Sequence, residues 1–170
     1  MQCHNLRQLA GSVFADHYQA LVSQEAGVFS SEVEAVHDMR VATRRLRVAL
    51  SNFAVCCDPG IRRSLRAQLG RLADQLGAVR DLDVMLAALK RRKAELPAAQ
   101  KPFLRGLIRR LQARRLRCRR RLREFLRGDD YAEFKREFRN LISEASDLSV
   151  GIELPPQTES QDKDGEGIQG

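Results

Sequence analysis

Residues 36–53 read VHDMRVATRRLRVALSNF, and this stretch decides the fold that the sequence predicts. At about 3.6 residues per helical turn, its apolar side chains fall on a single arc about 100° wide. An arc of this width is typical of an amphipathic helix that buries one face against its neighbours. The apolar arc consists of Met39, Ala42, Leu46, Ala49, Leu50 and Phe53.

Glycines, prolines and capping residues divide the rest of the chain into further helical segments. Ser31 and Glu34 form a capping box that favours a helix start, and Asp58-Pro59-Gly60 ends that helix near Cys57. Short connections favour antiparallel neighbours. The sequence therefore predicts an all-α fold, an antiparallel helical bundle of about four to five helices over residues 1–148. The other expected helices cover about 6–24, 61–93, 103–127 and 130–146.

Composition excludes several classes of protein. No apolar run approaches the roughly 20 residues that cross a bilayer, so no membrane association is expected. A hydrophobic content of 43% is too high for a disordered chain, although residues 149–170 lack periodicity and are predicted to be a disordered acidic tail. The four cysteines form no metal-binding spacing, and no signal peptide is recognised. We therefore expect a cytoplasmic protein with reduced thiols.

Positive charge is concentrated in the middle of the chain. The 170 residues contain 30 Lys+Arg, of which 25 are arginine, against 22 Asp+Glu, for a net charge of +8. Residues 37–127 hold 25 basic and seven acidic residues, a net charge of +18, whereas both flanks are net negative. A basic block of this size is typical of a protein with a polyanionic partner, such as nucleic acid, a phosphate polymer or anionic lipid.

A second arc of the 36–53 helix is basic. His37, Arg40, Arg44 and Arg47 share an arc about 80° wide opposite the apolar face, and Arg45 lies on one flank. Stacked like charges cost a few tenths of a kcal/mol per pair, unless a polyanion neutralises them. Arginine suits that ligand because its planar fork donates two parallel hydrogen bonds to phosphate oxygens. The alternative is a solvated basic face.

A buried acid is expected in the segment LGAVRDLDV, residues 76–84. Asp83 falls within the leucine stripe of its helix, and an unpaired buried carboxylate costs several kcal/mol. We expect an arginine of the helix over residues 31–57 to pair with it, either to orient that arginine toward a phosphate or as a structural ion pair. In the 103–127 helix, Arg115 lies within the apolar stripe, where it either snorkels or lines a polar cleft.

Taken together, the histidine helix and the LGxxRDxD block resemble the CHAD family, the conserved-histidine α-helical domains, over about residues 5–147. The resemblance implies an all-helical domain that binds inorganic polyphosphate through basic side chains, in the cytoplasm or in association with polyphosphate granules. From the residues themselves we expect no catalysis, no metal and no cofactor. Asp81 and Asp83 occupy the acidic positions of the family. The implied polyphosphate contacts are His37, Arg40, Arg44, Arg45, Arg47, Arg80, Arg114, Arg115 and Arg119.

One departure from the family concerns length. Full CHAD domains resemble two related helical halves that face each other across a cationic groove, and this chain matches only the first half. No second basic helix follows Ser146. The implied partners are therefore inorganic polyphosphate and either a second copy of the chain or a second CHAD half.

Two other functions remain open. Generic nucleic-acid binding is less favoured, because base recognition uses aromatic stacking and the chain has two tyrosines, seven phenylalanines and no tryptophan. An accessory or regulatory module of a polyphosphate or triphosphate enzyme is the other alternative. The chain itself is not expected to be an enzyme, since no phosphate-binding glycine loop or nucleophile motif is found. His37 with scattered carboxylates makes a weak metal site.

Overall fold

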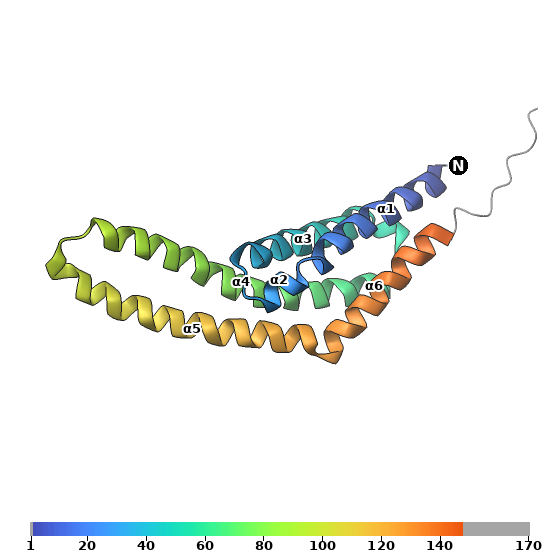
Figure 1. Cartoon of the computed structure of the whole chain (residues 1–170). Helices are drawn as coiled ribbons and strands as arrows, with labels where there is room; N and C mark the ends of the chain where they lie inside the picture. The colour runs from blue at the N-terminus through green and yellow to red at the C-terminus, as the bar shows by residue number, and fades with distance from the viewer. Residues whose placement is uncertain (1, 148–170) are drawn as a thin grey trace, which may run out of the picture.

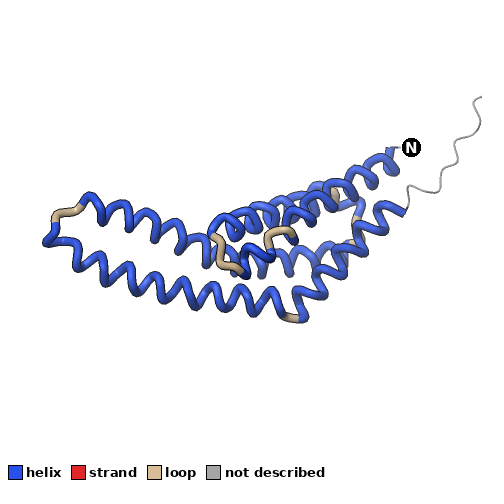
Figure 2. Tube along the Cα trace, viewed as in Figure 1, coloured by secondary structure: helices blue, strands red, loops and turns tan. Residues whose placement is uncertain are grey.

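The computed structural model describes residues 2–147, and every regular element in that range is a helix (Figures 1 and 2). This arrangement confirms the predicted all-α bundle. The predicted acidic tail, residues 149–170, lies outside the described residues. The elements are α1 (Gln2–Val22), α2 (Glu25–Phe29), α3 (Val33–Asn52), η1 (Ala54–Cys56), α4 (Pro59–Glu95), η2 (Ala98–Gln100), α5 (Lys101–Arg127) and α6 (Asp129–Asp147).

The hydrophobic core lies where α1, α3, α4 and α6 pack together, with the last turns of α5. The predicted apolar arc of α3 is confirmed, since five of its members are buried and Phe53 packs against the core. Aromatic rings fill the space between α1 and α6. Phe14 and Phe138 meet edge to face at 6.0 Å between ring centroids, and Tyr18 stacks on Phe138 at 5.4 Å. Such pairs contribute about 0.5–1.5 kcal/mol each beyond their buried area.

A two-helix arm extends from the bundle (Figure 1). The core cluster ends at Val79 on α4 and begins at Cys118 on α5, so residues 84–114 lie beyond it and form what we call the α4–α5 arm. Within the arm, α4 and α5 bury Leu86, Leu104 and Ile108 against each other. The arm therefore depends on a thin apolar seam, and Phe103 at its end is 80% exposed.

The start of α3 differs from the predicted capping box. Ser31 has a φ of 69°, and the N-cap is Glu32, which makes no side-chain capping bond. Gly27 lies inside the short helix α2. A Cβ at Gly27 would lie 2.6 Å from the Cβ of Ala35, so only glycine allows α2 to lie this close to α3. This close approach fixes the tight turn in which Ser31 adopts its positive φ.

The end of α3 also differs from the prediction, because the helix stops at Asn52 and a 3₁₀ turn covers Ala54–Cys56. The Asp58-Pro59-Gly60 signal acts instead as the start of α4. Asp58 Oδ1 accepts hydrogen bonds from the backbone N–H groups of Gly60 at 2.7 Å and Ile61 at 3.0 Å. Asp58 is thus the N-cap of α4, and Pro59 occupies the first helical position.

Helix α2 is held against α6 by polar contacts. The Tyr131 hydroxyl donates a hydrogen bond of 2.8 Å to Glu25 Oε1, and Lys135 Nζ lies 3.2 Å from Glu25 Oε2. Burial, together with this hydrogen bond, raises the pKa of the Tyr131 hydroxyl, which stays protonated as the donor.

Among residues 2–147, no helix has both the length and the apolar character needed to span a bilayer.

Candidate functional site

A cavity of about 420 Å³ lies between α3 and α4, and we call it the α3–α4 groove. Four of its lining residues are members of the basic arc predicted on α3. The structure therefore brings His37, Arg40 and Arg44 together with Arg47 in one place. The complete lining is His37, Arg40, Val41, Arg44, Arg47, Ala73 and Asp74.

Ala73 and Asp74 of α4 form the opposite side of the groove, and two glycines lie on the same helix face as Ala73. Gly70 and Gly77 precede and follow Ala73 by three and four residues, which places all three on one face of α4. A Cβ added at Gly70 or Gly77 would have no atom within 4 Å beyond its own helix backbone and chain neighbours. The space above this face is therefore open, and a ligand can approach the α4 backbone closely.

Arginines lie at both ends of this face. Arg66, four residues before Gly70, donates hydrogen bonds to Ser51 Oγ and, at 3.5 Å, to the carbonyl oxygen of Arg47. Arg80, three residues after Gly77, is half-buried at the other end. Arg80 is one of the site residues predicted from the sequence, whereas Arg66 is not among them. Arg66 could have been predicted from its spacing, because positions 66, 70, 73, 77 and 80 follow one another by three or four residues and so lie on one face of α4.

The groove is strongly cationic. The guanidinium groups of Arg40, Arg44 and Arg47 form no ion pair with any residue that the structure describes, and all three side chains are exposed. Asp74 is the one acid in the lining given above. His37 Nδ1 is buried without a hydrogen-bond partner among the described residues. The groove thus presents unneutralised donors for an anion.

Asp83 does not belong to this groove. Its side chain is only 3% exposed, and it forms ion pairs with Arg115 Nε and, at 3.3 Å, with Arg119 Nη2. Arg119 also donates to the carbonyl oxygen of Ser31. The prediction that an arginine of the 31–57 helix pairs with Asp83 is wrong, because α5 rather than α3 packs along this part of α4.

The Asp83 cluster is a clamp at the base of the α4–α5 arm. The side chain of Arg119 is 7% exposed. Its Nη1 donates to the carbonyl oxygen of Ser31, and its Nη2 donates to Asp83 Oδ2, so both partners lie inside the protein. Arg115 is 27% exposed and is held by the same carboxylate. Of the two interpretations of Asp83 left open by the sequence, the geometry favours the structural ion pair, since it joins α4, α5 and the turn before α3.

The remaining predicted site residues are scattered. Arg45 faces α1 and lines a separate cavity of about 370 Å³ with Val13 and His17, and Arg44 reaches both cavities. Arg114 and Asp81 are exposed on α5 and α4, and neither has an ion-pair partner within the described part of the chain. The structure therefore divides the predicted set between the groove, the clamp, the cavity against α1 and the open surface.

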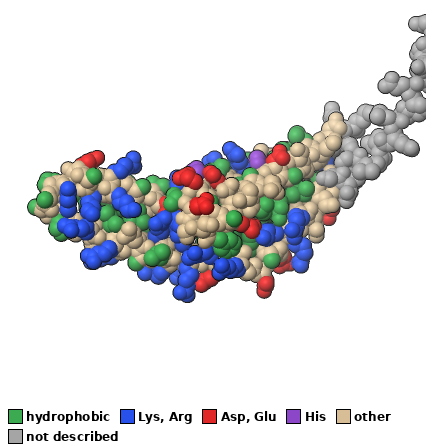
Figure 3. All heavy atoms as spheres, in the orientation of Figure 1, with side chains coloured by type: hydrophobic (Ala, Val, Ile, Leu, Met, Phe, Trp, Pro, Cys, Tyr) green, Lys and Arg blue, Asp and Glu red, His purple; other side chains and the backbone are tan. Residues whose placement is uncertain are grey.

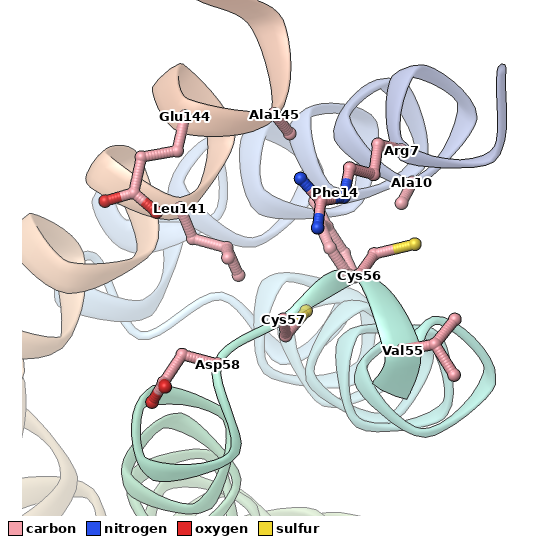
Figure 4. A pocket seen from close by; sticks show the side chains of 10 residues that line it. All are labelled: Arg7, Ala10, Phe14, Val55, Cys56, Cys57, Asp58, Leu141, Glu144 and Ala145. Atoms are coloured by element: carbon pink, nitrogen blue, oxygen red, sulfur yellow. The ribbon is translucent and has the colours of Figure 1, made fainter. Parts of the chain in front are cut away.

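A further cavity, of about 330 Å³, lies where α1, α6 and the α3–α4 connection meet (Figure 4). Arg7, Asp58 and Glu144 line it, so it mixes charges and offers no net positive surface to a polyanion. Cys56 and Cys57 also line it (Figure 4). Burial, with a contribution from Cys56, raises the pKa of the Cys57 thiol, which makes it a poor nucleophile.

Comparison with known proteins identifies one family. The family model described as CHAD domain matches residues 12–163, which includes all of α2 to α6 and about half of α1. No curated protein and no solved structure matches the chain. The match covers both sides of the groove and the Asp83 clamp.

Proposed function

The chain belongs to the CHAD family, which is associated with polyphosphate- and triphosphate-related proteins, and from this premise we propose that it binds inorganic polyphosphate in the α3–α4 groove without catalysis. One observation carries the proposal: His37 and three arginines without ion-pair partners in the described structure line one groove, opposite Ala73 and Asp74 of α4. Arginine forks donate paired hydrogen bonds to phosphate oxygens and remain charged at any physiological pH.

The shape of the groove favours a thin ligand without bases. Its lining contains no aromatic ring on which a nucleobase could stack, and Val41 and Ala73 are its apolar members. Single-stranded nucleic-acid binders obtain about 1–3 kcal/mol per base from such stacking. A linear phosphate polymer needs only the hydrogen-bond donors of the groove.

The lining also supports binding rather than turnover. Among the groove residues there is no serine, threonine or cysteine nucleophile, and the cations other than His37 are arginines, which do not exchange protons at physiological pH. Within residues 2–147, no cluster of three or more potential metal ligands lies near enough to hold an ion. We therefore assign the groove a binding role.

Competition tests the ligand class. We expect long-chain polyphosphate to displace a fluorescent DNA duplex, and a single-stranded RNA, from the whole chain at equal total phosphate concentration. The reason is that electrostatic attraction acts on both ligands, whereas the groove adds close donor contacts only for the narrower polymer. Fluorescence anisotropy measures the displacement. If either nucleic acid resists displacement, a nucleic-acid function replaces this proposal.

His37 gives the groove a predicted pH dependence. Histidine changes charge between about pH 5 and pH 8, and a protonated ring donates a stronger, charge-assisted bond to phosphate. We expect the wild-type chain to bind polyphosphate about tenfold more tightly at about pH 5.5 than at about pH 8. His37→Gln should remove most of this ratio, which calorimetric titration at the two pH values measures.

The matched control for His37 is His17→Gln. His17 lies on the other side of α3, in the cavity shared with α1, and should leave the ratio unchanged. The end groups of polyphosphate also titrate, but this changes the affinity ratio equally for the wild type, His37→Gln and His17→Gln, so it does not affect the comparison between them. A ratio that persists in His37→Gln would exclude a direct contact between this ring and the ligand.

A further inference from the structure

A second cationic cavity, of about 620 Å³, opens between the two helices of the α4–α5 arm. Two lysines of α4 and two arginines of α5 line it, and no acidic residue does. The space-filling view shows basic side chains gathered over the free end of the arm (Figure 3). The lining consists of Lys90, Lys93, Arg105, Ile108, Arg109 and Gln112.

The four charges of this cavity are not neutralised within residues 2–147. None of them forms an ion pair there, and the nearby acid Glu95 is instead paired with Arg92 at 3.1 Å. Like charges facing each other across two helices weaken the pairing of those helices. The seam that opposes this repulsion is thin, since Ile108 is the apolar residue of the lining. An anion between the helices would remove the repulsion.

We propose that this arm cavity, formed by Lys90, Lys93, Arg105 and Arg109, is a second binding site for phosphate groups, which a long polyphosphate chain occupies together with the α3–α4 groove. This inference rests on the proposed function of the groove. Short oligophosphates bind the two sites independently, whereas one long chain bridges them.

The helix that joins the two sites sets the distance between them. Ala73 in the groove and Lys90 in the arm lie on the same helix, 17 residues apart, which corresponds to about 25 Å along the axis of α4. Tripolyphosphate is too short to bridge this distance. A long chain can, and linking two sites through one ligand raises apparent affinity by about 10²–10⁴. The structure therefore predicts a preference for long chains.

Stoichiometry with tripolyphosphate tests the number of sites. Calorimetry of the whole chain should give two tripolyphosphate ions per protein. It should give one for the arm variant (Lys90→Gln, Lys93→Gln, Arg105→Gln and Arg109→Gln) and one for a groove variant (Arg40→Gln, Arg44→Gln and Arg47→Gln). One ion for the wild type together with an unchanged arm variant would overturn the second site. An unchanged groove variant would instead overturn the proposed function of the groove.

Affinity for long-chain polyphosphate tests the bridging. The arm variant should bind it at least tenfold more weakly than the wild type, while its affinity for tripolyphosphate at the groove stays within about threefold. The charge-matched control removes four exposed arginines outside both cavities, Arg120, Arg121, Arg136 and Arg139, each by substitution to Gln. If the control loses as much long-chain affinity as the arm variant, the effect is one of net charge, and the bridging proposal is wrong. Circular dichroism confirms that each variant remains helical.

Discussion

Replacing Asp83 with alanine is expected to lower the free energy of unfolding by about 3–5 kcal/mol. The substitution leaves Arg119, with 7% of its side chain exposed, as a buried cation without its carboxylate, and it also releases Arg115. Breaking a buried ion pair from one side is far more costly than the pair is worth, because the remaining charge cannot be solvated. Urea unfolding, followed by far-UV circular dichroism, measures the loss.

Two controls separate the clamp from general charge effects. Arg120→Ala breaks the exposed pair with Glu124 on the same helix and should change stability by no more than about 0.5 kcal/mol. Replacing Asp83, Arg115 and Arg119 together by leucine removes the charges from both sides and should recover most of the loss. A cost below about 1 kcal/mol for Asp83→Ala would contradict the clamp.

Removing the three groove arginines is expected to weaken polyphosphate binding by about 100-fold. Each of Arg40, Arg44 and Arg47 contributes a net of about 1 kcal/mol or more through charge-assisted hydrogen bonds, and every 1.4 kcal/mol changes the dissociation constant by about tenfold. The variant is Arg40→Gln, Arg44→Gln and Arg47→Gln. Stability should change little, because the three side chains are exposed and without ion-pair partners in the described structure.

Salt dependence identifies the origin of this loss. For single-stranded nucleic acids, log affinity falls against log salt with a slope of about −0.7 per neutralised phosphate, so losing three contacts should make the slope shallower by about 2. The control Arg120→Gln, Arg136→Gln and Arg139→Gln carries the same net charge and should keep affinity within about threefold. Equal losses in both triple variants would mean that the positive field of the protein, rather than the groove, binds the ligand.

The sequence determined the groove better than it determined the clamp. A single helical period places His37, Arg40, Arg44 and Arg47 on one face of α3 opposite the apolar arc, and the structure follows that period. Periodicity does not say which helix packs beside a given face. Asp83 was correctly expected to be buried and paired, but its partner depended on α5 lying along α4, which no local pattern encodes.

Tertiary contacts also explain why the predicted start of α3 differs from the observed one. The capping box at Ser31 was a sound local signal, yet the approach of Gly27 to Ala35 draws the turn into a shape in which Ser31 has a positive φ. The same turn directs the Ser31 carbonyl toward Arg119. Arg66 was missed because its role depends on which residues of α3 and α4 meet, and the helical period of α4 alone does not predict its contact with Ser51.

The central claim is that polyphosphate occupies the α3–α4 groove, and the histidine ring signals in NMR spectra test it most directly. The chain has three histidines, and two of them lie on opposite sides of α3: His37 in the groove and His17 in the cavity shared with α1. During titration of the whole chain with polyphosphate, the ring resonances of His37 should shift with the ligand while those of His17 stay constant. Shifts at His17 without shifts at His37, or no shift at either ring under saturating ligand, would contradict the claim.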